Sequence, residues 1–385
     1  MTPTPLQVEA HTSFLRNGRS VSKTAKELNK TDTAVKKLLF GAALNGLQIG
    51  TEFSKALPAG MELEKASVLT DGDGNVKLVW HKGKGISSSV DDFAQFCEQR
   101  IPANKVKLPK VNKSNKHLML EWPVFDPHHG MLAWADETGT DYDHKISRHL
   151  QESAGKILFQ SFGRVRRTVI ILGGDNQTAD NSQGVTEKSG NVLDTDTRFA
   201  KMVWCSYETS VTCIEMAANF SDEVYVFVLS GNHDPHSAIH LTIQLHAYFR
   251  NVQNVKIDTS PEKHRFWRWG STVFMGTHGD INEKRVAPYM MQQVIRRGMA
   301  HEPVERMMVR MGHLHKRGRK TPDMLTEEDG VIVERFPTLA AQEAYSVEAG
   351  YTSVRATSAN LWHDRHGRYG GREITLGEIL ERHPI

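Results

Sequence analysis

Short apolar runs alternate with longer amphipathic stretches over the second two thirds of the chain. The runs span residues 118–125, 168–172, 224–229, 272–275 and 307–311. The stretches between them repeat apolar residues at helical spacing and span residues 146–162, 198–218, 238–250 and 286–299. This alternation predicts an α/β fold in which helices cover the faces of a sheet. Cys205 and Cys213 fall on an apolar helical face and are expected to be core residues.

The first 50 residues predict a small helical domain. Helices are expected over residues 8–17, 21–28 and 33–44, with Ser20 and either Thr31 or Asp32 as caps. The last two helices and their turn resemble a helix-turn-helix, which places its second helix in the major groove of DNA. Lysines on these helices are then candidate phosphate contacts: Lys23, Lys26, Lys36 and Lys37. The alternatives are a module that docks on protein, or a solvated basic face.

Residues 51–118 carry a weaker pattern. Residues 66–69 and 76–80 flank an Asp/Gly/Asn-rich segment, which predicts a β-hairpin, and five lysines spread over residues 105–116 predict a solvated linker. We therefore expect three segments: a helix-turn-helix-like domain at 1–50, a hairpin and basic linker at 51–118, and a large α/β domain at 119–385.

Composition narrows the class of protein without identifying it. The 385 residues carry a formal charge of only +3, so any excess of positive charge that binds nucleic acid must be confined to part of the surface. Three cysteines without paired spacing argue against a disulfide framework or a thiolate zinc site and fit a reducing cytoplasm. No apolar run approaches the ~18 residues of a membrane span, and the N-terminus has no secretory pattern. We expect a cytoplasmic protein without membrane contact, while self-association and protein partners stay open.

Chemically active residues follow each of the five apolar runs. In chain order these segments are Asp126-Pro127-His128-His129, Gly173-Gly174-Asp175-Asn176, Gly231-Asn232-His233-Asp234, Gly276-Thr277-His278-Gly279-Asp280 and Gly312-His313-Leu314-His315. In α/β sheets, ligands bind beyond the carboxyl ends of the strands, where such segments converge. Each motif alone is weak, but five in succession predict a shared site.

This ordered set resembles the calcineurin-like metallophosphoesterase superfamily over about residues 119–320. The resemblance implies a two-sheet α/β sandwich flanked by helices, with two metal ions at the sheet edge. It implies that Asp126, His128 and His315 hold one ion, that Asn232, His278 and His313 hold the other, and that Asp175 bridges them. Independently, carboxylate and amide oxygens mixed with imidazoles suit Mn²⁺, Fe or Zn²⁺, of which Mn²⁺ is our expectation.

Two residues beside the ligands are candidates for proton transfer. The family pattern places His233 near the leaving oxygen, and we expect it to act as a general acid with Asp234 fixing its tautomer. The alternative for His233 is a structural histidine that anchors the loop. His129 is expected either to reach substrate or to face solvent.

The start and end of the motif set look closest to the nuclease subunit of double-strand-break repair complexes. We therefore expect a phosphodiesterase acting on DNA, with Lys316 and Arg317 gripping the flanking backbone. One departure is Thr178, where that branch often has a histidine or an acidic residue, and Asp180 can replace it only if the loop is rearranged. The alternatives are a phosphomonoesterase acting on protein or nucleotide, and a DNA-binding regulator with a non-catalytic phosphoesterase scaffold.

Overall fold

The structure is a computed structural model that describes residues 3–44, 61–70, 76–85, 90–101, 115–187, 190–313, 325–350 and 353–385. Compactness divides the chain into two units, Met1–Phe93 and Ala94–Ile385, and each is considered by itself. The expected boundaries at residues 50 and 118 remain predictions. Among the described residues, no helix is both long and apolar enough to cross a bilayer.

The first unit contains the three expected helices and the expected hairpin. The helices are α1 (Pro5–Arg16), α2 (Val21–Glu27) and α3 (Asp32–Leu44), and the antiparallel strands are β1 (Met61–Thr70) and β2 (Val76–Gly85). Side-chain oxygens of Thr4, Ser20 and Thr31 accept backbone N–H groups in the first turns, as helix caps do. The helices share a small core of Ala10, Phe14, Val21, Ala25, Val35, Leu39 and Ala42. The hairpin turn at residues 71–75 lies outside the described part of the chain.

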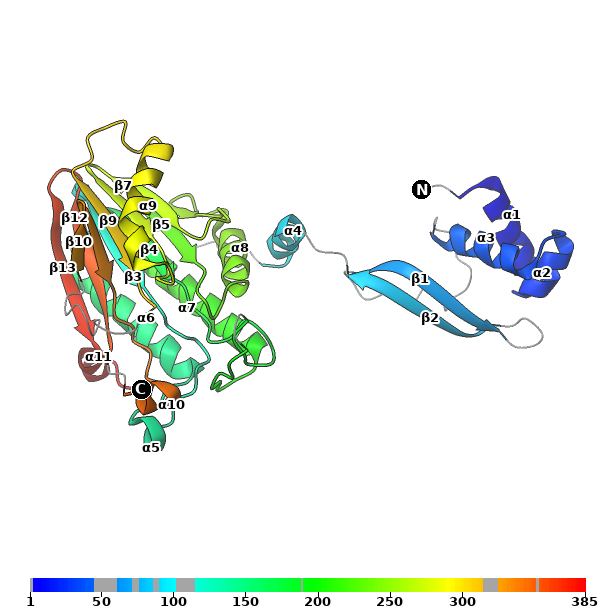
Figure 1. Cartoon of the computed structure of the whole chain (residues 1–385), viewed down its shortest axis with the longest axis horizontal. Coiled ribbons are helices and arrows are strands. Elements are labelled where there is room, and N and C mark those ends of the chain that lie inside the picture. Colours follow the sequence, from blue (N-terminus) through cyan, green and yellow to red (C-terminus); the bar gives the residue numbers. More distant parts are fainter. Residues whose placement is uncertain are drawn as a thin grey trace. The chain divides into compact units, whose positions relative to one another are not determined.

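The second unit contains two mixed sheets (Figure 1). One has the order β13-β12-β3-β4-β5-β6 and the other β10-β11-β9-β8-β7. The strands are β3 (Asn115–Val124), β4 (Val165–Gly173), β5 (Ser221–Leu229), β6 (Val255–Ile257), β7 (Arg265–Trp269), β8 (Thr272–Gly276), β9 (Arg306–Met311), β10 (Leu325–Glu328), β11 (Val331–Arg335), β12 (Ala356–His363) and β13 (Gly367–Thr375). All five expected strands of this region are present, with β3, β4 and β5 parallel in the first sheet and β8 and β9 parallel in the second.

Helices cover the outer faces of both sheets (Figure 1). The helices after β2 are α4 (Val90–Arg100), which straddles the boundary between the two units, and α5 (Ala135–Thr138), α6 (His144–Ser161), α7 (Phe199–Phe220), α8 (Ser237–Phe249), α9 (Glu283–Arg296), α10 (Ala344–Glu348) and α11 (Leu376–Arg382). Helices α6, α7 and α8 pack on one face of the six-stranded sheet, and α9 packs on the five-stranded sheet. The expected two-sheet α/β sandwich flanked by helices is therefore present. Helix α4, in the region expected to hold only a hairpin and a linker, was not predicted.

Strand residues alternate between two cores because successive side chains point to opposite faces. In β4, Ile170 and Leu172 join the core beneath α6 and α7, whereas Val169 and Ile171 join the core between the sheets. The inter-sheet core is aromatic and contains Trp267, Phe274 and Trp362. Cys205 and Cys213 are buried in α7, as expected.

One buried ion network joins the two sheets. Arg310 on β9 is fully buried and donates to Glu121 on β3 (2.8 and 3.0 Å) and to Glu334 on β11 (2.7 Å). The Trp362 indole donates to the same Glu121 carboxylate (2.9 Å). Removing one member would leave an uncompensated charge inside the sandwich.

Candidate metal centre

The candidate ligands lie where five strands end. Asp126 and His128 follow β3, Asp175 follows β4 and Asn232 follows β5, all in the six-stranded sheet. His278 follows β8 and His313 follows β9 in the five-stranded sheet. The site is therefore shared by the two sheets, and the inter-sheet core holds its two halves together.

His278 is the centre of this arrangement and is completely buried. Its Nε2 lies 3.0 Å from Asn232 Oδ1, 3.0 Å from His313 Nδ1 and 3.3 Å from Asp175 Oδ2. Its Nδ1 lies 3.2 Å from the Gly173 carbonyl. In the neutral tautomer whose Nδ1–H donates to the Gly173 carbonyl, the Nε2 lone pair faces Asn232, His313 and Asp175. This tautomer is assigned from the carbonyl partner of Nδ1.

Asp126 and Asp175 are fixed by backbone donors. Asp126 Oδ2 accepts from His313 N (2.7 Å) and Asp175 Oδ1 accepts from His233 N (2.8 Å), so each carboxylate ties two segments together. Asp126 Oδ1 also lies 3.4 Å from His278 Nδ1. His128 is buried, donates its backbone N–H to the Asp175 carbonyl (3.0 Å), and places its ring edge-on to that of His233.

Backbone strain is concentrated at the same residues. Asp126, His128, Asp175 and His313 have φ values of +52°, +45°, +44° and +68°, and they are four of the seven non-glycine residues with positive φ in the described chain. Such conformations cost about 1–3 kcal/mol each and persist where the surroundings enforce them, most often at functional sites. Gly231 allows the close approach, because a Cβ there would lie 1.9 Å from Asp175 Oδ1.

Asp234 does not play the role that we expected. Its oxygens accept the backbone N–H groups of Gly231 (2.9 Å), Asp175 (3.0 Å) and Asn176 (2.7 Å), so it pins the two ligand loops together. His233 Nδ1 instead lies 2.8 Å from the Thr178 carbonyl. The expectation that Asp234 fixes the His233 tautomer is wrong, because a backbone carbonyl occupies that position. Asp234 is a positioning residue.

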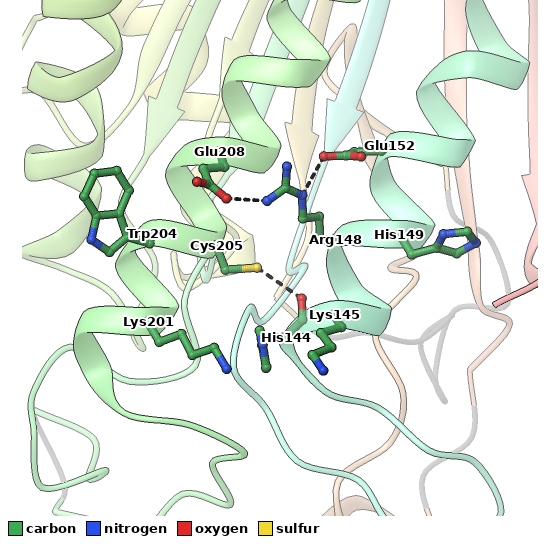
Figure 2. Close-up of a pocket in the computed structure, with 9 residues that line it drawn as sticks. All are labelled: His144, Lys145, Arg148, His149, Glu152, Lys201, Trp204, Cys205 and Glu208. Atoms are coloured by element: carbon green, nitrogen blue, oxygen red, sulfur yellow. Dashed lines mark hydrogen bonds and ion pairs between the residues drawn. The ribbon is translucent and has the colours of Figure 1, made fainter. Parts of the chain in front are cut away.

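His129 neither reaches the centre nor faces solvent. It is buried behind the site, with Nδ1 2.8 Å from Ser147 Oγ on α6, and burial lowers its pKa to about 3. Beyond it, α6 and α7 line a pocket of about 400 Å³, where Arg148 pairs with Glu152 and Glu208 (Figure 2). The exposed Trp204 forms part of the same wall.

The loop after Asp175 is built for structure. The Thr178 side chain is buried and its hydroxyl donates to the His128 carbonyl (3.1 Å), so it does not point to a substrate. Asp180 accepts the backbone N–H groups of His236 (2.7 Å) and Ser237 (2.8 Å) at the start of α8. These contacts hold Asp180 at the start of α8. Asp180 therefore does not take the place of the histidine or acidic residue that the nuclease branch often has at position 178.

Several contacts at the site were not predicted. Thr338, which precedes α10, donates its hydroxyl to the Asp126 carbonyl (2.6 Å). Burial raises the pKa of the Glu343 carboxyl, and the nearby His233 imidazole opposes this rise only in part. The Gly173 and Thr178 carbonyls give no sequence signal, since every residue carries a carbonyl. His315, Lys316 and Arg317 lie outside the described residues.

Electrostatics indicate a centre that attracts positive charge. Burial alone would lower the pKa of His278, but Asp175 and Asp126 outweigh it and raise that pKa to about 10. Burial raises the pKa of Asp126 to about 8 despite the opposing charge of His278. Burial acts to raise the pKa of Asp175 as well, but the charge and hydrogen bond of His278 hold it below its ordinary value.

The residues present fit divalent metal ions. The ligand atoms of Asp175, His278 and His313 all lie within 4.8 Å of one another, and the Asn232 oxygen adjoins them. Together they offer imidazole nitrogens with carboxylate and amide oxygens, a set that suits Mn²⁺, Fe or Zn²⁺. These are the residues expected to hold the second ion, together with the aspartate expected to bridge the two ions. Of the expected first-ion set, Asp126 and His128 adjoin this group.

Comparisons with known proteins identify no family. No family model matches the sequence, and no curated protein does. Structural matches include a Vps29 variant from Entamoeba histolytica, with 12% identity, 67% of this chain and 99% of that chain covered, and a TM-score of 0.28. A predicted phosphoesterase from Streptococcus pneumoniae matches with 12% identity, 68% and 99% coverage and a TM-score of 0.24. Chaetomium thermophilum Vps29 matches with 10% identity, 67% and 96% coverage and a TM-score of 0.26. Similarity at this level supports no assignment of activity, so function is argued from the site itself.

Proposed function

We propose that the protein is a metal-dependent phosphoesterase that hydrolyses phosphodiester bonds in DNA. The observation that carries the proposal is the convergence on His278 Nε2 of an amide oxygen, an imidazole nitrogen and a carboxylate oxygen drawn from both sheets. Asn232, His278 and His313 would hold one ion, Asp126, His128 and His315 the other, and Asp175 both. Two divalent ions bound there, for which we propose Mn²⁺, would supply Lewis acidity that lowers the pKa of water and neutralises charge on a phosphoryl group.

The chain's own residues would position the ester and move a proton. His233 Nδ1 lies against the Thr178 carbonyl, which leaves Nε2 as the nitrogen able to donate. A protonated His233 can deliver that proton to the leaving oxygen as the phosphorus–oxygen bond breaks. Asp234 keeps the His233 and Asp175 loops in register through its backbone hydrogen bonds.

Replacing His233 with glutamine should lower kcat about 10²–10³-fold while metal content stays at the wild-type level, because the variant loses a proton donor and no proposed ligand. Single-turnover kinetics and elemental analysis measure the two quantities. The kcat for a substrate whose leaving group needs no proton, such as the p-nitrophenolate of a p-nitrophenyl ester, should fall far less. Loss of metal together with activity would instead make His233 a ligand or a structural residue.

The DNA part of the proposal rests on the three-helix core of the first unit. Helix α2 is separated from α3 by residues 28–31, and the side chains of Lys23, Lys26, Lys36 and Lys37 are exposed on the two helices. Buried Val35 and Leu39 seat α3 on the core, which leaves its lysines in water. A short helix, a turn and a longer basic helix suit binding in a DNA groove.

A substrate panel tests the activity. With Mn²⁺ present, we expect cleavage of single-stranded or duplex DNA and of bis-p-nitrophenyl phosphate, and little hydrolysis of RNA, phosphopeptide or p-nitrophenyl phosphate. Preference for the monoesters would replace the nuclease proposal with a phosphatase. Full metal occupancy without turnover on any member of the panel would leave a non-catalytic scaffold.

Changing Lys36 and Lys37 to glutamine should weaken DNA binding about equally for all sequences, and should reduce the dependence of log affinity on log salt by a slope of about 1 per lost phosphate contact. Fluorescence anisotropy over a salt series measures both effects. Turnover of bis-p-nitrophenyl phosphate should be unchanged, since that small ester does not need the first unit. Unchanged affinity and slope would exclude α3 from DNA binding.

A further inference from the structure

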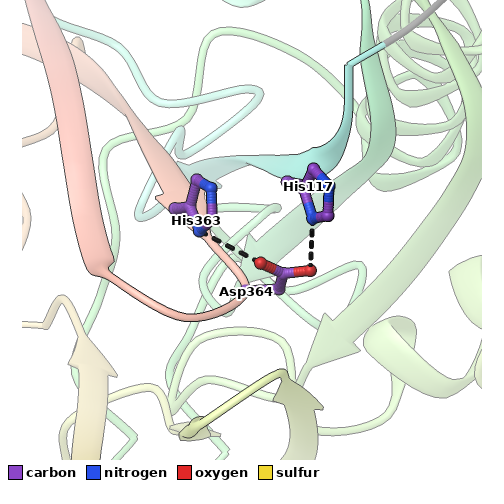
Figure 3. Close-up of side chains that lie close together, drawn as sticks. All are labelled: His117, His363 and Asp364. Carbon is purple, nitrogen blue, oxygen red and sulfur yellow. Dashed lines mark hydrogen bonds and ion pairs between the residues drawn. The ribbon is translucent and has the colours of Figure 1, made fainter.

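A second group of metal-ligating side chains lies in the large unit. His117 Nδ1 is 2.8 Å from Asp364 Oδ2, and His363 Nδ1 is 3.0 Å from Asp364 Oδ1 (Figure 3). The two imidazole rings are stacked, with centroids 5.4 Å apart. All three ligand atoms lie within 4.8 Å of one another. The carboxylate therefore lies between two imidazoles that both turn Nδ1 toward it.

The group lies at the end of the sheets opposite the metal centre. His117 is near the amino end of β3, whereas Asp126 follows its carboxyl end, and His363 ends β12. The Asp364 carbonyl accepts from Ser271 N (2.9 Å) in the turn between β7 and β8 of the other sheet. A Cβ on Gly270 would lie 1.6 Å from that carbonyl oxygen, so only glycine allows this approach. The β3 start, the β12–β13 turn and the β7–β8 turn meet here.

We propose that His117, His363 and Asp364 bind one Zn²⁺ ion that fastens the start of β3 to the β12–β13 turn at this end of the six-stranded sheet. Two imidazoles and one carboxylate favour a borderline transition ion over Mg²⁺ or Ca²⁺, which prefer all-oxygen sites. Bonds of about 2 Å in tetrahedral geometry place neighbouring ligand atoms roughly 3.3 Å apart, so the distances of 2.8 and 3.0 Å would each widen by a few tenths of an ångström when the ion binds. Water completes the shell, since His117 is 53% exposed at its side chain.

The ion would stabilise the fold because it binds the folded chain and not the unfolded one. His117 and Asp364 are 247 residues apart in the chain, so only folding brings these ligands together. The competing explanation is that Asp364 only accepts a hydrogen bond from His117, while His363 Nδ1 accepts the Arg365 N–H (3.1 Å) and needs no metal ion. The two explanations differ for asparagine, which keeps an acceptor oxygen but loses the charge that a metal ion requires.

Zinc binding in a background that disables the proposed catalytic centre tests the idea. In full-length Asp175→Ala/His278→Ala protein, titration with ZnCl₂ should load one ion per chain and raise Tm by roughly 5 °C at about 100 times the Kd. Adding His117→Ala or Asp364→Asn should remove both the bound ion and the Tm shift. His301→Ala, a change at an exposed histidine elsewhere in the unit, should remove neither.

Two results would overturn the proposal: no zinc bound at 100 µM in the double-variant background, or zinc binding that survives both His117→Ala and Asp364→Asn. If the double variant does not fold, equilibrium dialysis of otherwise wild-type protein replaces it, and each cluster variant should then bind one ion fewer than wild type. These readouts need no turnover. The zinc site can therefore be confirmed in a protein that hydrolyses no phosphoester, and it can be excluded in one that does.

Discussion

Replacing Asp175 with asparagine should lower phosphodiester hydrolysis about 10³-fold or more. Asp175 is the proposed bridge between two ions that each supply several kcal/mol of transition-state stabilisation, and every ~1.4 kcal/mol lost is tenfold in rate. Its Oδ1 also holds the His233 backbone and its Oδ2 faces His278, so the change weakens the whole centre. Turnover of bis-p-nitrophenyl phosphate with Mn²⁺, together with metal content, measures the effect.

The matched control is Asp136→Asn, the same chemical change at an exposed aspartate in α5. It should leave kcat, KM and metal content unchanged. Circular dichroism should show both variants folded, because asparagine retains the shape of the side chain. Activity of Asp175→Asn within tenfold of the control would show that Asp175 does not bridge catalytic ions.

Replacing Arg310 with methionine should destabilise the large unit by about 3–5 kcal/mol. Glu121, fully buried beneath the second sheet, would lose the guanidinium that it faces at 2.8 and 3.0 Å and would be left as a buried unpaired charge. Urea unfolding followed by tryptophan fluorescence measures the change, since six of the seven tryptophans lie in this unit.

Two further variants separate lost charge pairing from lost packing. Arg310→Met combined with Glu121→Gln should recover at least about 1 kcal/mol, because the uncompensated charge is removed. Arg306→Met, at a partly exposed arginine on the same strand, should change stability by less than about 0.5 kcal/mol. If the double variant is as unstable as Arg310→Met alone, packing and not charge pairing holds this position.

The five strands that lead to the site and the helices α6 to α9 could be predicted because they carry strong local patterns. The apolar runs ending at Asp126, Asp175 and Asn232 are buried strands, and polar side chains at their carboxyl ends have one shared edge at which to meet. Helix α4 was not predicted, although Val90, Phe93 and Cys97 recur in it at helical spacing. The C-terminal strand-like pieces at residues 331–336 and 374–375 were expected to close an edge of the second sheet, but β11 joins the five-stranded sheet whereas β12 and β13 join the six-stranded one.

Within the site, residue types were easier to predict than their partners. The Asp, Asn and His positions follow from motifs at strand ends, and the structure brings Asp126, Asp175, Asn232, His278 and His313 together. The Asp234 contacts could not be predicted, because its partners are backbone N–H groups that any sequence supplies. The Thr178 and Gly173 carbonyls that orient His233 and His278 could not be predicted either, because every residue carries a backbone carbonyl. The position of His129 could not be predicted, because its ring is hydrogen-bonded to Ser147 on α6, which is distant from the ligand motifs in the sequence.

The hydrogen bond between Asp126 and His313 joins residues 187 positions apart. During synthesis at about 5–20 residues per second, its two partners emerge from the ribosome roughly ten seconds or more apart. Throughout that interval the early half of the centre exists without the late half. A nascent chain should therefore bind the proposed ions only after β9 and His313 have been synthesised. Fragments that end before β9 should be unable to capture them, however well their own sheet has formed.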